Sequence, residues 1–149
     1  MGQATVSQRR RAVSVDPALV ARAEAALDRL SVHFGPWMNE ELGLLYAARA
    51  RVHTEGLNPD TGEHLSLQVH EVKGLASTFG FPIVTHIAGS LCKLVEDPDT
   101  RLGAPMFLVD AHIDAVKAAV KGGIQTDSDP VGHALVTELE QRVKEFAAG

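Results

Sequence analysis

A histidine, a lysine and a glycine stand close together as His70, Lys73 and Gly74, in the stretch LQVHEVKGLASTFGF. Neutral imidazole is a good nitrogen nucleophile at physiological pH, and a nearby ammonium group can balance the negative charge of a phosphoryl group. A glycine inside a helix costs about 0.5–1 kcal/mol relative to alanine, which indicates a local need for space. The three residue types at this spacing favour phosphoryl chemistry at His70, with Gly74 leaving room for the incoming group.

The helix that must position these residues is predicted from its apolar pattern. Apolar side chains recur at intervals of three and four residues from Leu65 to Phe79, which is the period of an amphipathic helix. His70 follows an apolar position by one residue, about 100° around the axis, and therefore lies at the edge of the core or in solvent. Residues three, four or seven positions away lie on the same side of the helix. Those that we expect to surround the histidine with small or apolar groups are Ser66, Leu67 and Ser77.

The rest of the chain shows the same helical period, and the strict alternation typical of strands is absent. Six helices with short connections predict an all-α fold, an antiparallel four-helix bundle with additional N-terminal helices. We expect residues 1–15 to form a flexible tail and residues 16–149 to form one helical domain. Helix breaks are predicted at Gly35-Pro36, across the turn-rich stretch 55–63, at Gly80, and after Lys121.

Composition argues against several classes of function. The net charge of −5 gives no overall positive field for nucleic acid or an anionic membrane, and no apolar run could span a bilayer. A single cysteine, Cys92, excludes an internal disulfide framework and a cysteine-rich zinc site. The other six histidines form no HExxH motif, and no phosphate-binding loop or ATP-binding module is present, so no metal site and no autokinase activity are expected. Without a secretion signal, a cytoplasmic protein is the expectation.

The stretch HEVKGLASTFGF resembles the motif of histidine-containing phosphotransfer (HPt) domains. In that motif His-x-x-Lys-Gly is followed by small residues and by a glycine ten positions after the histidine. His70, Lys73, Gly74 and Gly80 match it, and the resemblance is specific from about residue 65 to residue 96. At Cys92, twenty-two residues after the histidine, several family members place a Gln or Glu that hydrogen-bonds the imidazole.

The resemblance implies an HPt bundle that serves as an intermediate in a multistep phosphorelay, rather than a classical enzyme. His70 would accept a phosphoryl group from the aspartyl phosphate of one receiver domain and pass it to another. Lys73 would hold phosphoryl charge, and Gly74 would keep the approach open. The implied partners are response-regulator receiver domains and a hybrid sensor kinase, and the receiver would supply both the aspartate and the Mg²⁺. No cofactor is expected in this chain, and a monomer is expected rather than a dimer.

Two alternatives follow from the same residues. A non-catalytic helical interaction module could bind a receiver or another signalling partner without being phosphorylated, and Cys92 is the departure that most favours it. Gly74 could also serve close packing between helices rather than access to His70. An exposed Leu67, one turn before the histidine, could anchor a docking helix of the partner by apolar contact.

Overall fold

The all-α prediction is confirmed by a computed structural model, which describes the backbone of residues 16–148 and the side chains of residues 16–25 and 35–148. No strand occurs among these residues. The expected tail at 1–15 lies outside the described residues. The elements in chain order are α2 (Pro17–Glu55), α3 (Pro59–Leu75), α4 (Pro82–Val95), the 3-10 turn η1 (Arg101–Gly103), α5 (Met106–Gly122) and α6 (Pro130–Ala148).

The chain divides into two compact units after Phe34. The first unit contains the start of α2, where the Asp16 carboxylate accepts the backbone N–H groups of Ala18 and Leu19 and so caps the helix. The predicted helix break at Gly35-Pro36 is wrong, because α2 continues through Pro36. A proline removes only its own N–H from the helical ladder, and the turns on either side keep the backbone helical.

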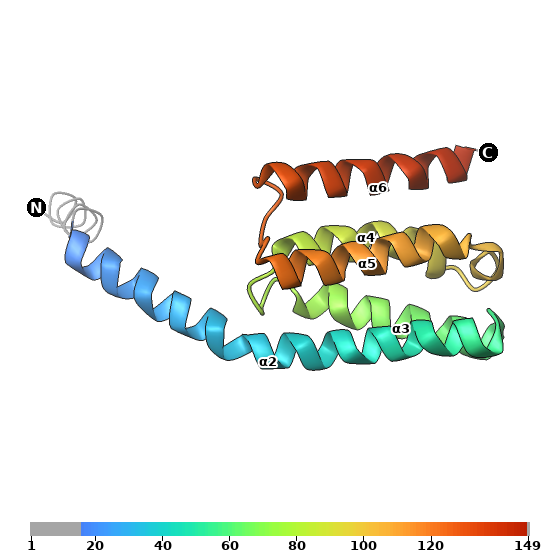
Figure 1. Cartoon of the computed structure of the whole chain (residues 1–149), viewed down its shortest axis with the longest axis horizontal. Helices are drawn as coiled ribbons and strands as arrows, with labels where there is room; N and C mark the ends of the chain where they lie inside the picture. The colour runs from blue at the N-terminus through green and yellow to red at the C-terminus, as the bar shows by residue number, and fades with distance from the viewer. Residues whose placement is uncertain (1–15, 149) are drawn as a thin grey trace, which may run out of the picture. The chain divides into compact units, whose positions relative to one another are not determined.

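The second unit, Gly35–Gly149, packs around one apolar core to which all of its α-helices contribute. Figure 1 shows α6 lying along α4 and α5, the two helices against which it packs. The apolar face predicted for α3 is buried at Leu65, Val69 and Val72, whereas the antiparallel order of four helices stays a prediction. Within the described helices, none is both long and apolar enough to cross a membrane. The core is represented by Met38, Leu42 and Leu45 of α2, Leu65, Val69 and Val72 of α3, Ile83, Ile87 and Leu91 of α4, Val109, Ile113 and Val116 of α5, and Val136, Leu139 and Val143 of α6.

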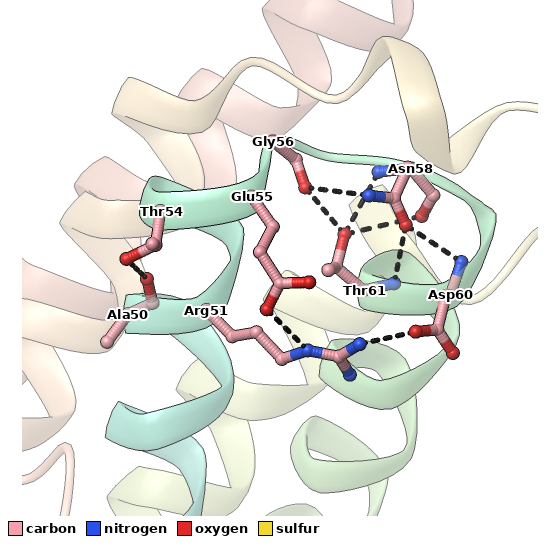
Figure 2. A network of polar contacts seen from close by, with 8 residues as sticks. All are labelled: Ala50, Arg51, Thr54, Glu55, Gly56, Asn58, Asp60 and Thr61. Carbon is pink, nitrogen blue, oxygen red and sulfur yellow. Dashed lines mark hydrogen bonds and ion pairs between the residues drawn. The ribbon is translucent and has the colours of Figure 1, made fainter.

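The connection that fixes the start of α3 is shorter than the predicted turn at 55–63, because α3 begins at Pro59. The Asn58 side-chain oxygen accepts the N–H groups of Asp60 and Thr61 at 3.0 and 2.9 Å. In return, the Thr61 hydroxyl accepts the Asn58 N–H at 3.0 Å, which completes a capping box (Figure 2). This cap sets where the helix that carries His70 starts.

Ion pairs join the end of α2 to its neighbours. The Arg51 guanidinium spans the connection to α3 and contacts both Glu55 and Asp60 (Figure 2). Arg49 donates to Asp114 of α5 at 2.6 Å. Exposed pairs of this kind add little to stability, so we assign them a role in orienting α2 against α3 and α5.

The far end of α3 is closed by the glycine predicted to cap it. Gly80 has φ of +91°, a left-handed conformation that glycine adopts without strain. The Phe81 N–H donates to the Ala76 carbonyl at 2.8 Å, and the Gly80 N–H donates to the Ser77 carbonyl at 3.2 Å. This pair of bonds is a Schellman motif, so helical hydrogen bonding extends past Gly74 and that glycine lies in a helix interior.

A fully buried histidine connects α5 to α4 in the core. The Leu108 carbonyl can only accept, so His112 Nδ1 carries the proton and donates to it at 2.7 Å. His112 Nε2 therefore accepts from the Ser90 hydroxyl at 3.0 Å. Burial lowers the pKa of His112 below its ordinary value, an effect that the backbone hydrogen bond opposes in part. His112 is thus a neutral structural group in the folded protein.

The low pKa of His112 predicts how stability depends on pH. Below about pH 6.5, the ordinary histidine pKa, His112 binds a proton in the unfolded chain but stays neutral in the folded protein. The free energy of unfolding should therefore fall as pH drops through this value, by at most about 1.4 kcal/mol per pH unit for this residue. Denaturant unfolding of the wild type and of His112→Gln between pH 5 and 8 measures the difference in slope. NMR titration of the His112 ring gives a second readout, and a midpoint at or above the ordinary value would contradict the prediction.

Candidate functional site

His70 lies at an open groove formed by α3 and α4, with a volume of about 530 Å³. The His70 side chain is exposed and Lys73 is half-buried. The three residues predicted to carry the chemistry therefore meet at one surface feature. The groove is lined by His70, Glu71, Lys73, Gly74, Leu75 and Thr85.

The glycine in this groove has no packing role. A Cβ atom added at Gly74 would meet no heavy atom within 4 Å outside its own turn of helix. At Gly132, by contrast, a Cβ would lie 2.7 Å from Ile83 Cδ1 and 2.8 Å from the Thr126 carbonyl oxygen. The packing interpretation of Gly74 is therefore wrong. The space beside His70 faces outward, where a molecule from solution can occupy it.

The Thr85 hydroxyl of α4, which was not among the predicted site residues, links α4 to α3 at this groove. Thr85 Oγ1 donates to the Lys73 carbonyl at 3.3 Å, so the Ser77 hydroxyl donates to Thr85 at 2.9 Å. Ser77, predicted as a binding residue, thus anchors α3 to α4 and keeps its own oxygen available as an acceptor. Like Ser90, Thr85 is a hydroxyl residue in the largely apolar α4, and no local sequence signal indicated its contact with α3.

Two further predicted binding residues lie outside the groove lining. Leu67 is 58% exposed, as predicted for an apolar residue one turn before the histidine. The Ser66 side chain is half-buried and forms no hydrogen bond with the described side chains or backbone. The structure therefore presents a large apolar side chain next to the groove, on the same helix as His70.

The imidazole of His70 has no hydrogen-bond partner among the described side chains. Cys92, at the position where several members of the HPt family place Gln or Glu, is buried, as expected for a small residue near the core. Burial raises the pKa of the Cys92 thiol, an effect that the Lys73 ammonium opposes in part, so the thiol is protonated at neutral pH. Lys73 therefore acts electrostatically on α4 as well as on the groove.

Among the side chains of residues 16–25 and 35–148, no group of three or more His, Cys, Asp or Glu is arranged to hold a metal ion. The groove nevertheless combines a nucleophilic nitrogen, an ammonium group and open space. Glu71 is the one acidic residue among those that line it. A comparison with protein-family models, curated proteins and solved structures finds no match to the chain.

The open space at Gly74 predicts an unusual effect on stability. Gly74→Ala should raise the free energy of unfolding by about 0.5–1 kcal/mol, because alanine is the better helix former and meets no neighbour. Gly132→Ala should lower the free energy of unfolding by about 1–3 kcal/mol, because its methyl group overpacks the contact with Ile83. Urea unfolding of the two variants and the wild type measures both changes. A loss of stability in Gly74→Ala would show that the site is tightly packed after all.

Proposed function

We propose that this chain is a histidine phosphotransfer protein of a multistep phosphorelay, working in the cytoplasm, with His70 as phosphoacceptor and phosphodonor. The observation that carries the proposal is the unfilled space at Gly74 beside the exposed imidazole of His70. Open space at a helical glycine is not unique to this position, since Gly43 and Gly89 have it too, but Gly74 lines a groove together with His70, and an approaching partner accounts for the space there. The match of His70, Lys73, Gly74 and Gly80 to the HPt motif supports the same conclusion.

The reaction asks little of the protein beyond a nucleophile and a docking face. The lone pair of an imidazole nitrogen of His70 forms a bond to phosphorus. The bond from phosphorus to the aspartyl oxygen of the receiver breaks, and the carboxylate leaves with the electron pair. The Lys73 ammonium offsets the charge of the transferring phosphoryl group. The return step to a second receiver reverses these bonds, with Mg²⁺ held by the receiver.

Thr85 and Ser77 are proposed to support this chemistry through position. By holding the Lys73 carbonyl and joining α3 to α4, they set the width of the groove into which the phosphoryl group enters. Leu67 is proposed as the apolar docking contact, because it is exposed and lies one turn from His70. An apolar contact of this kind supplies affinity, while the charges around it select the partner.

The absence of a described hydrogen-bond partner for His70 favours a second candidate. A module that binds a receiver or another signalling partner without being phosphorylated needs no group to orient the imidazole. The buried thiol of Cys92 is a weak hydrogen-bonding group in place of an amide or carboxylate. The two candidates differ in whether a phosphoryl group is transferred, not in whether a partner binds.

A relay assay separates them. Purified receiver domains are phosphorylated with labelled acetyl phosphate, and label is followed into the chain. At least one receiver should label the wild type and leave His70→Gln unlabelled. Leu67→Asp should slow transfer by about tenfold or more, since burying a leucine is worth about 1.5–3 kcal/mol.

Val131→Asp is the matched control, because Val131 is 59% exposed on α6 and does not line the groove. It should transfer at the wild-type rate, and circular dichroism should show all four proteins equally helical. Equal labelling of the wild type and His70→Gln would contradict the proposal. A receiver that binds the wild type and His70→Gln equally, with transfer to neither, would establish the interaction module instead.

A further inference from the structure

A second groove lies between α2 and α5 and shares no residue with the groove at His70. Its volume is about 470 Å³, within the range of about 300–1,000 Å³ usual for small-molecule sites. An apolar floor is provided by Leu42, Phe81 and Val120. The complete lining is Gly35, Asn39, Leu42, Tyr46, Phe81, Lys117, Val120 and Lys121.

The polar side chains of this groove are hydrogen-bond donors, and no carboxylate is among them. They are the Asn39 amide, the Tyr46 phenol, and the ammonium groups of Lys117 and Lys121. Two lysines one helical turn apart repel each other, at a cost to helix stability. Neither lysine forms an ion pair with a described residue. The groove therefore concentrates positive charge on a chain whose net charge is −5.

The acidic residues of α5 that could neutralise these lysines are engaged elsewhere. Asp114 accepts from Arg49 at 2.6 Å, and Asp110 lies 2.9 Å from Nε2 of His53. Both contacts turn the α5 carboxylates toward Arg49 and His53 of α2. The positive charge at the groove is thus left for a ligand from outside.

In the groove, Tyr46 lies between the apolar floor and the ammonium groups of the two lysines. The Lys117 ammonium lies 5.5 Å from the centroid of the Tyr46 ring, which keeps the lysine over the groove. Burial raises the pKa of Tyr46, and the nearby Arg49 opposes this effect in part. The phenol is therefore neutral at physiological pH and can donate to an anion.

We propose that this groove binds a small amphipathic anion. A carboxylate or phosphate head would lie against Lys117 and Lys121, with the Tyr46 hydroxyl as a further donor. The apolar body would cover Leu42, Phe81 and Val120. Charge complementarity selects an anion, and the apolar floor selects an anion that carries a hydrocarbon part. This site is separate from the proposed phosphotransfer chemistry.

Calorimetric titration tests the proposal with four probes, each kept below the concentration at which it forms micelles or aggregates. The probes are decanoate, decyl phosphate, decanol and inorganic phosphate. One molecule of decanoate or decyl phosphate should bind per chain, at least about tenfold tighter than decanol or inorganic phosphate. The double variant Lys117→Gln/Lys121→Gln should bind the better anion at least about tenfold more weakly. Preference between the two anions then tells which head group the site takes.

The matched control is Lys93→Gln/Lys144→Gln, which removes two exposed lysines outside the groove. This control and His70→Gln should both bind the anion as the wild type does, so the result is independent of relay activity. Binding of decanol as tight as that of decanoate and decyl phosphate would overturn the proposal, and so would equal binding by inorganic phosphate. Unchanged affinity in Lys117→Gln/Lys121→Gln, or no binding by any probe, would overturn it too.

Discussion

The buried apolar face of α3 is the constraint on which the candidate site depends. Leu65, Val69 and Val72 are fully buried, and this fixes the rotation of the helix about its axis. A shift of one residue would turn every side chain by about 100° and bury His70 in place of Val69. The Asn58 capping box sets the start of the helix and the Gly80 Schellman motif sets its end, so the register has little freedom. The exposure of His70 is a consequence of this packing.

Those parts of the fold that depend on local periodicity and capping were predictable from sequence. The apolar face of α3, the Asp16 and Gly80 caps and the exposure of Leu67 all follow from residue types within a few positions of one another. The continuous α2 was not predictable in this way. Gly35-Pro36 is a strong local signal for a break, yet the helical turns on either side of Pro36 carry the backbone through it.

Contacts at the site that join two helices could not be predicted from the sequence pattern either. Thr85 faces the Lys73 carbonyl only because α4 packs on α3, and nothing local to Thr85 indicates that contact. The surroundings of the two glycines could not be predicted from sequence either. Gly74 and Gly132 both lie within helices, but one opens onto solvent and the other touches Ile83, and only the packed structure separates access from packing. This distinction connects the stability of α3 to its proposed function, because the glycine weakens the helix and its open side is where the proposed relay would admit a partner.

The central claim, that His70 accepts a phosphoryl group, is tested most directly by chemical phosphorylation. The purified protein and His70→Gln are incubated with phosphoramidate, intact mass is followed, and the modified residue is mapped at mildly basic pH. We predict one added phosphoryl group on the wild type, located at His70, labile in acid and absent from the variant. No modification of the wild type, or equal modification of both proteins at scattered histidines, would contradict the claim.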